Sequence, residues 1–320
     1  MFMSVRQAAQ KWDISERRVR ILCSEGRIEG VVRSGWAWNI PLTSLKPGDG
    51  RQLRHLKNFE LRFGSLDLSR LDTLQKQLSC MKGNETTFLG DYKKLILRFI
   101  ESSFACEGIA VTSDQLSLLF GGEFVPDLAM ETQLLALNCR SILLRFVQET
   151  GLGPCKGLKK ESSTFNEQRL STLYRTMMQG IDDEDLALYR KVSIPPANPQ
   201  GNDLRLFPVS VQMEILMNQY ENEWIHLHPL VRALFLYGEL LRICPFEHYC
   251  SVFATLVLGG ELLFGGYPPV LVDPSHLDEF KASLMLTRKR GNYQNVVRML
   301  EQSLLYELTK LLPKETLHGL

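Results

Sequence analysis

Four side chains with the chemistry of metal ligands or nucleophiles lie between residues 226 and 248. They are His226, His228, Cys244 and His248. Histidine and cysteine together can bind zinc, and a Cys–His pair can generate a thiolate nucleophile. The spacing is unfavourable for both, because two histidines at i and i+2 do not share a helix face. The sequence therefore favours packing roles for these residues, with no metal site.

The segment Arg242–Thr255 lies between two other short motifs. His228-Pro229 precedes it, and Gly266-Tyr267-Pro268-Pro269 follows it. This order and spacing resemble the core of the Fic (Fic/Doc) family. In that family the segment reads His-Pro-Phe-x-Asp/Glu-Gly-Asn-Gly-Arg-x-x-Arg on a loop that opens a helix. The resemblance implies transfer of AMP from ATP to a protein hydroxyl, and it places His228 at a helix start away from the loop.

The chain departs from the family motif at its reactive positions, and only Pro245 and Phe246 match. Cys244 stands in place of the catalytic His, His248 in place of the metal-binding acid, Tyr249-Cys250-Ser251-Val252 in place of Gly-Asn-Gly-Arg, and Thr255 in place of the last Arg. These changes remove a general base, a hard oxygen ligand for Mg²⁺, two phosphate-cradling glycines and two cations. Losing two or three such interactions at about 3 kcal/mol each raises the barrier by many powers of ten. We therefore predict no AMP transfer by the family's mechanism and expect no cofactor.

A second motif supports the resemblance. Residues 100–112 contain Ser103, Glu107 and Gly108 in the spacing Ser-x-x-x-Glu-Gly, which resembles the inhibitory helix motif of the family. There the Glu pairs with the final Arg of the loop and blocks productive ATP binding. Because Thr255 cannot make that pair, we expect Glu107 to face Arg190 or Arg242 instead.

Other family landmarks follow in order. Asn138 lies on an apolar helical segment, and Tyr174 stands where the family usually has a histidine. Tyr189-Arg190 resembles the segment that leads into a flap, and Pro195–Asp203 is rich in turn formers, as a hairpin tip requires. A loop filled by Tyr249 and His248 would leave no room for a phosphate chain.

The N-terminus predicts two short helices and a hairpin. Residues 4–12 have one apolar face, and Ser15 is a good N-cap for a second helix over Glu16–Glu25. Val31–Arg33, a Ser34-Gly35 turn and Trp36–Ile40 read as a wing, with both tryptophans packing it against the helices. The segment resembles the small winged helix-turn-helix of the excisionase and MerR type.

Charge is concentrated in this N-terminal segment. Residues 1–54 hold ten lysines and arginines against five acidic residues, whereas the whole chain carries a net charge of only +1. A basic patch of this kind is typical of contact with double-stranded DNA. The candidate DNA contacts are Arg17, Arg18 and Arg20 on the second helix and Arg27 and Arg33 on the wing. The alternative is a solvated face on a winged helix that binds protein. Specific affinity would require two copies, which a homodimer supplies.

Composition bounds the remaining possibilities. The chain has 320 residues, 44% of them hydrophobic, which suffices for a sizeable core. No stretch resembles a signal peptide or a membrane span. The seven cysteines form no Cys-x-x-Cys, so we expect reduced thiols and a cytoplasmic location.

The predicted fold is mainly α. Residues 1–50 are expected to form the winged helix-turn-helix and 51–90 a partly helical connector, helical over Leu66–Leu78. Residues 91–312 are expected to form an all-helical Fic-like domain with a small β-hairpin flap, and 313–320 a tail. Val296, Leu300, Leu304 and Leu308 recur every four residues on a last helix, whose stripe either closes the core or pairs two subunits.

Three hypotheses remain from the sequence. The first is a bacterial DNA-binding regulator whose degenerate Fic domain serves regulation, dimerisation or protein binding. The second is a Fic-type AMP-transferase that uses ATP and Mg²⁺ by an unusual route through Cys244 or His248. The third is a scaffold that binds neither DNA nor nucleotide.

Overall fold

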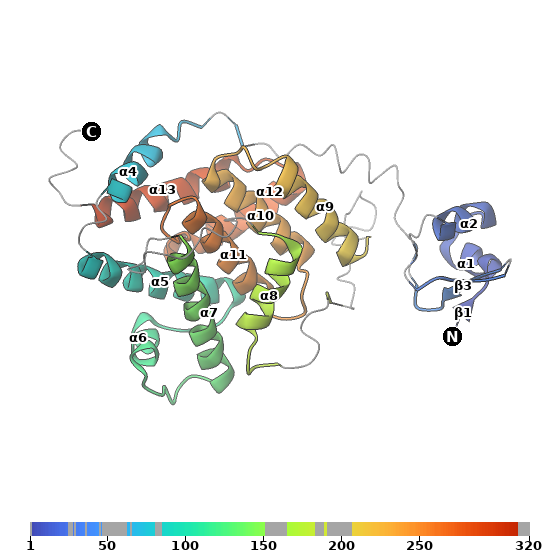
Figure 1. Cartoon of the computed structure of the whole chain (residues 1–320), viewed down its shortest axis with the longest axis horizontal. Helices are drawn as coiled ribbons and strands as arrows, with labels where there is room; N and C mark the ends of the chain where they lie inside the picture. The colour runs from blue at the N-terminus through green and yellow to red at the C-terminus, as the bar shows by residue number, and fades with distance from the viewer. Residues whose placement is uncertain are drawn as a thin grey trace. The chain divides into compact units, whose positions relative to one another are not determined.

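The computed structural model describes residues 2–24, 28, 30–35, 37–44, 46, 63–64, 66–80, 85–150, 165–182, 189–190 and 207–312. The chain is mainly helical, as predicted, with one small sheet (Figure 1). It divides into two compact units. The first holds residues 1–59 with 194–208, and the second holds 60–193 with 209–320. The predicted flap tip, Arg27, Trp36 and the tail lie outside the described residues.

The N-terminal unit begins with two helices, α1 (Val5–Trp12) and α2 (Glu16–Ser24). Ser4 and Gln7 form a capping box that starts α1. The hydroxyl of Ser15 accepts a hydrogen bond from the Arg18 N–H at 3.2 Å, so Ser15 is the predicted N-cap of α2. Asp13, in the left-handed region with φ 51°, makes the turn between the helices.

A three-stranded antiparallel sheet covers these helices. Its strands are β1 (Phe2–Met3), β2 (Val32–Ser34) and β3 (Ala37–Pro41), in the order β1-β3-β2. Ser34 pairs with Ala37 and belongs to β2, so the predicted Ser34-Gly35 turn was wrong in including Ser34. Gly35 has φ 61°, which a side chain rarely adopts and which a hairpin turn of this kind requires. Trp38 packs against the helices, as predicted.

The helical unit is built around α11. Its elements are α4 (Ser69–Cys80), α5 (Glu85–Glu107), α6 (Ser113–Gly121), α7 (Met130–Glu149), α8 (Glu167–Met177), α9 (Val209–Asn222), α10 (Pro229–Ile243), α11 (Cys250–Phe264), α12 (Leu277–Arg290) and α13 (Gln294–Leu311), with a 3₁₀ turn at Pro274–His276. α11 contacts α5, α7, α8 and α10 (Figure 1). Every residue from Val252 to Leu263 is buried. Such burial on all sides explains why the sequence of α11 is apolar around its whole circumference.

Two glycines allow the close approach of neighbouring side chains to α11. A methyl group at Gly259 would lie 2.7 Å from the Phe99 ring, and one at Gly260 would lie 2.8 Å from both Phe146 and Phe165. Glycine is therefore required where α5 and α7 pack against this helix.

The predicted last helix is α13. Its four-residue stripe of Val296, Leu300, Leu304 and Leu308 is completely buried. The stripe closes the core of this chain, because α13 packs against α4, α10 and α12. The stripe is therefore not available to pair two copies. α4 also contributes to this core through Leu71, Leu74 and Leu78.

None of the helices in the described ranges is both long enough and apolar enough to cross a membrane.

Candidate functional site

The degenerate motif lies on the loop that joins α10 to α11. Cys244 ends α10 in the left-handed region with φ 45°, and Tyr249 precedes α11 in the same region with φ 54°. Pro245 cannot continue α10, because it has no backbone N–H to donate. Side chains are uncommon at positive φ, so two such residues must be held by their surroundings. The loop opens a buried helix, as the resemblance implied.

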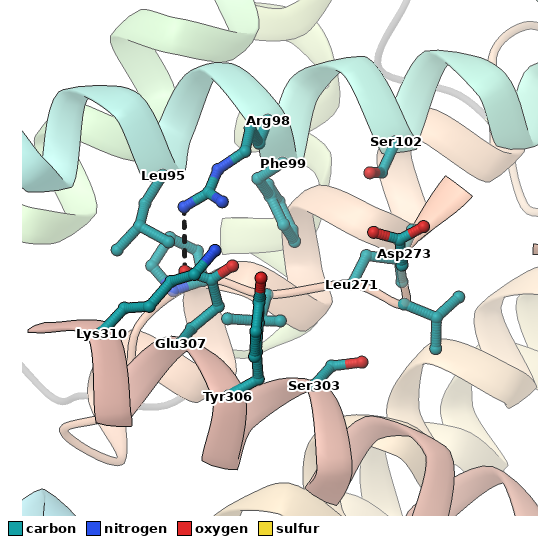
Figure 2. Close-up of a pocket in the computed structure, with 13 residues that line it drawn as sticks. Leu95, Arg98, Phe99, Ser102, Leu271, Asp273, Ser303, Tyr306, Glu307 and Lys310 are labelled. Carbon is teal, nitrogen blue, oxygen red and sulfur yellow. Dashed lines mark hydrogen bonds and ion pairs between the residues drawn. The ribbon is translucent and has the colours of Figure 1, made fainter. Parts of the chain in front are cut away.

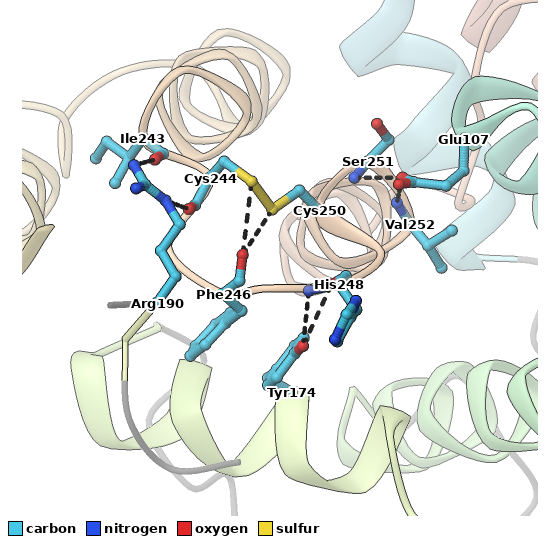
Figure 3. The surroundings of a disulfide bond; sticks show 10 residues. All are labelled: Glu107, Tyr174, Arg190, Ile243, Cys244, Phe246, His248, Cys250, Ser251 and Val252. Carbon is cyan, nitrogen blue, oxygen red and sulfur yellow. Dashed lines mark hydrogen bonds between the residues drawn. A yellow bond between two sulfur atoms is a disulfide. The ribbon is translucent and has the colours of Figure 1, made fainter. Parts of the chain in front are cut away.

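Arg190 clamps the first end of this loop. Its guanidinium donates to the carbonyl oxygens of Cys244 at 2.7 Å and Ile243 at 3.1 Å (Figure 3). Its backbone N–H donates to the carbonyl oxygen of Pro245 at 2.9 Å. The last carbonyls of a helix have no intrahelical donor, and a cation is favoured beside them. Burial lowers the pKa of Arg190, but a guanidinium stays charged at neutral pH.

An aromatic cluster holds the middle of the loop. The rings of Phe246 and Tyr174 stack at 3.9 Å, and Phe253 meets Phe246 edge to face at 5.0 Å. The Tyr174 hydroxyl accepts the N–H of His248 and donates to its carbonyl oxygen, both at 3.3 Å. Burial raises the pKa of Tyr174, which keeps the hydroxyl protonated for this role. Tyr174 therefore fixes the loop backbone from α8.

Glu107 occupies the N-terminal end of α11. Gly108, with φ 84°, terminates α5 and leaves Glu107 as its last residue. One carboxylate oxygen of Glu107 accepts the backbone N–H groups of Ser251 at 2.7 Å and Val252 at 3.3 Å (Figure 3). These are first-turn donors without intrahelical partners, at the end of the helix where the dipole favours an anion. The place where an anion would bind is thus filled by a carboxylate of the same chain.

The expectation that Glu107 faces Arg190 or Arg242 was wrong. Arg190 caps α10, and Arg242 pairs with Glu239 at 2.7 Å and donates to Gln212 at 3.0 Å. In the part of the chain that the structure describes, backbone N–H groups and not a cation satisfy the Glu107 carboxylate. A sequence does not show which backbone N–H groups will be free to act as such donors.

The side chains of Tyr249 and His248 do not occupy the first-turn N–H groups of α11, which Glu107 binds. The Tyr249 hydroxyl donates to Glu131 on α7, and the His248 side chain is exposed. Burial, followed by the hydrogen bond to Glu131, raises the pKa of Tyr249. Glu107 is the side chain that lies at the N-terminal end of α11.

A disulfide joins Cys244 to Cys250, so the expectation of reduced thiols was wrong for this pair (Figure 3). The loop turns back between two helices and brings the two Cα atoms to 5.5 Å, within the range that a disulfide spans. Among the described residues, Cys23, Cys106 and Cys139 are free.

The remaining motif positions hold uncharged buried groups. Val252 and Thr255, which stand at the family's two arginine positions, are completely buried. The Thr255 hydroxyl donates to the Ser251 carbonyl at 2.7 Å. Ser103 is buried on α5, and its hydroxyl has no hydrogen-bond partner within the described part of the chain.

Glu107→Ala is expected to destabilise the helical unit by about 1 kcal/mol, the usual cost of losing an N-terminal helix cap. The reason is that two N–H groups of α11 lose their acceptor. Chemical denaturation followed by circular dichroism measures the change, and Glu107→Gln, which keeps an acceptor oxygen, should lose less. Glu123→Ala removes an exposed carboxylate on α6's C-terminal side as a control. Equal effects at 107 and 123 would contradict the capping role.

The candidate DNA-contact arginines differ in their surroundings. On α2, Arg17 is exposed, Arg18 is half-buried, and Arg20 forms an exposed ion pair with Glu16 at 2.9 Å. On β2, the Arg33 guanidinium lies 5.4 Å from the ring centre of Trp38. Arg17, Arg18 and Arg20 thus begin α2, whereas Arg33 lies against a ring of the hairpin.

A buried carboxylate within α11 was missed from the sequence. Glu261 is completely buried, pairs with Arg232 of α10, and accepts a hydrogen bond from the Tyr220 hydroxyl at 2.7 Å. Burial raises the pKa of Glu261, while Arg232 and Tyr220 oppose that rise. A charged residue inside an apolar helix was the available signal, because a buried charge needs a partner.

A separate pocket of about 140 Å³ lies between α5, α13 and residues 269–273 (Figure 2). Its charged groups already have partners: Arg98 pairs with Glu307 at 2.9 Å, Lys310 lies 3.9 Å from the Tyr306 ring centre, and Asp273 accepts hydrogen bonds from Ser275. No loop residue lines this pocket. Because its charged groups are already paired, this pocket is a weaker candidate site than the loop between α10 and α11.

The four residues with metal-ligand chemistry are not brought together. The His228 ring caps α10 through the Leu230 N–H and lies 3.0 Å from both Asp72 and the Tyr267 hydroxyl. Within the described ranges, no three His, Cys, Asp or Glu side chains are arranged to hold a metal ion. His228 and Cys244 therefore have separate structural partners.

No protein-family model matches the chain, and no curated protein matches it. Solved structures do. Fic-1 from C. elegans is 18% identical with a TM-score of 0.62, covering 76% of this chain and 69% of that one. A Fic domain containing signaling protein from Bacteroides thetaiotaomicron is 19% identical with a TM-score of 0.59, covering 76% of this chain and 96% of that one.

A Fic family protein from Desulfovibrio desulfuricans is 16% identical with a TM-score of 0.53, covering 78% of this chain and 76% of that one. At such low identity the likeness concerns the fold. The helical unit therefore has a Fic fold, in agreement with the resemblance of its motifs.

Proposed function

We propose that this chain is a bacterial, cytoplasmic regulator that binds double-stranded DNA through its N-terminal unit. In this proposal the Fic-fold unit no longer transfers AMP and serves regulation, dimerisation or protein binding. The observation that carries the DNA-binding part is the placement of Arg17, Arg18 and Arg20 at the beginning of α2. A helix that follows another after a short turn is the usual means of reading a major groove.

The hairpin supports the same proposal. β2 and β3 place Arg33 on an exposed edge, where it can meet a phosphate beside the groove. Lys11, by contrast, has a structural role, because it donates to the carbonyl oxygens of Leu42 and Ser44. We assign Arg17, Arg18 and Arg20 of α2 and Arg33 of β2 to DNA because of their positions on this helix and this hairpin.

Two copies are required for specific affinity. One small module makes few phosphate contacts, and specific sites are usually bound by dimers that match the symmetry of the DNA. We propose that the helical unit supplies the dimer contact, through a surface other than the buried stripe of α13.

Fluorescence anisotropy of the full-length protein with labelled duplex from upstream of its own gene tests DNA binding. The logarithm of the binding constant should fall linearly with that of the salt concentration, by about 0.9 for each phosphate neutralised. Absence of binding at low salt, or binding insensitive to salt, would leave the scaffold hypothesis in place.

Loss of AMP transfer is supported by the loop. Cys244 is tied into a disulfide and cannot act as a general base. Glu107 occupies the anion end of α11, and the buried Val252 and Thr255 provide no cation for a triphosphate. Each of these features removes an interaction that nucleotidyl transfer needs.

Incubation with labelled ATP and Mg²⁺ tests the loss of activity. We expect no labelled AMP on the protein itself or on lysate proteins, and no heat of ATP binding by calorimetry. Glu107→Ala should not restore transfer, because removing the carboxylate supplies neither a base nor a cation. Transfer by either protein would overturn the proposal and restore the AMP-transferase.

A further inference from the structure

The Cys244–Cys250 disulfide lies on a loop that is partly exposed to solvent. Both cysteines are partly exposed, and Glu247 and His248 between them are exposed. The bond links the cap residue of α10 to the first residue of α11, across six positions of sequence. A dissolved thiol can therefore reach the bond without unfolding the unit.

The described free cysteines differ from this pair. Cys23 and Cys139 are buried, and burial raises the pKa of both thiols, as it does for Cys106. A thiol with a raised pKa holds little reactive thiolate at neutral pH. Among the cysteines whose side chains the structure describes, exchange chemistry is consequently concentrated at the loop.

The two sulfurs are not equivalent. Cys250 begins α11, where the helix dipole stabilises a thiolate, whereas Cys244 ends α10, where it does not. The sulfur whose thiol is more acidic is the better leaving group. Attack on the Cys244 sulfur, with departure of Cys250, is therefore the favoured direction of reduction.

Contacts that do not involve sulfur hold the loop in place. Arg190 binds the Cys244 carbonyl, Tyr174 stacks on Phe246, and Glu107 binds the Ser251 N–H. These contacts keep the two thiols near each other after reduction. Reoxidation then needs no search through open conformations.

We propose that Cys244 and Cys250 form a reversible thiol–disulfide exchange site whose reductant is a small dithiol. A thiolate of the dithiol attacks the Cys244 sulfur, forms a mixed disulfide, and releases Cys250 as a thiolate that takes up a proton. The second thiolate of the dithiol then attacks its own bound sulfur and releases Cys244. The protein gains two protons and two electrons, and the dithiol becomes a cyclic disulfide.

Alkylation of the folded full-length protein tests this site, with dithiothreitol as the dithiol. After reductant is removed by quenching with iodoacetamide, peptide mass spectrometry should find two newly modified cysteines, both in the loop peptide. If the reduced protein is incubated with an excess of oxidised dithiothreitol before iodoacetamide is added, the disulfide should re-form and neither loop cysteine should be modified. Modification of the loop without reductant, or reduction only in denaturant, would overturn the proposal.

Single-cysteine variants test the direction of attack. Cys244→Ser leaves Cys250 alone, and Cys250→Ser leaves Cys244 alone. The rate of alkylation against pH should give a lower pKa for Cys250 than for Cys244, and the opposite order would reject the assigned direction. Cys139→Ser is the matched control. In this variant, reduction should still lead to alkylation of both loop cysteines. If a loop variant does not fold, alkylation of the wild-type protein with and without dithiothreitol still tests the exchange site.

Discussion

Replacing Arg232 with methionine is expected to lower the free energy of unfolding by about 3 to 5 kcal/mol, the cost of removing one partner of a buried ion pair. Glu261 is completely buried, and without Arg232 its charge would keep the Tyr220 hydroxyl as a hydrogen-bond donor and Arg169 as a cation that acts on it without a direct ion pair. Denaturant unfolding monitored by circular dichroism gives the measurement. Methionine keeps much of the volume of the arginine stem, so the lost charge dominates the effect.

Two further variants make the result specific. Arg145→Met removes an exposed arginine that pairs with Glu149 one turn along α7, and should change stability by no more than about 0.5 kcal/mol. Adding Glu261→Leu to Arg232→Met should recover part of the loss, because the unpaired charge is then gone. If Arg232→Met cost no more than Arg145→Met, the buried pair would not support α11.

The defect of Arg232→Met is also expected to depend on pH. Burial already raises the pKa of Glu261, and the variant loses the cation that opposes this rise. A carboxyl with a higher pKa in the folded state binds more protons there, so stability falls as pH rises above the unfolded value. The difference from wild type should be largest at neutral pH and smaller near the unfolded pKa of about 4.3.

Local features of the fold were predictable because their causes lie within a few residues. The Ser15 N-cap and the stripe of α13 follow from neighbours one turn away. Gly108 ends α5 because it adopts φ 84° with little cost. Ser34 was predicted to lie in the hairpin turn but ends β2, because the glycine at position 35 marks a turn without showing how far the strand before it extends.

The contacts that define the site are long-range and were not predictable in this way. Glu107 binds backbone groups of Ser251 and Val252, and any residue type offers such groups. Two cysteines six positions apart pair only if the chain between them turns back, and spacing alone does not decide this. Family likeness identified the loop, but the closure of the loop depends on this chain's own substitutions.

These substitutions act together. Disulfide, guanidinium clamp and aromatic stack hold the loop without metal or phosphate, while Glu107 satisfies the N–H groups that a phosphate would need. Backbone groups of Cys244, Pro245, His248, Ser251 and Val252 are paired from within the unit. These contacts support our proposal that the Fic fold persists here without nucleotide and that the arginines of α2 serve its function.

Replacing Arg17 and Arg18 together with alanine is expected to weaken DNA binding by at least about 1 to 3 kcal/mol if one of them contacts a base, and to lower the salt slope by about 1 if one contacts a phosphate. Anisotropy titrations over a series of salt concentrations separate these effects. Arg145→Ala with Arg175→Ala removes the same charge from exposed positions of the helical unit and should leave both quantities unchanged. Equal losses for the two double variants would indicate a response to net charge, whereas a loss confined to α2 identifies the surface that meets DNA.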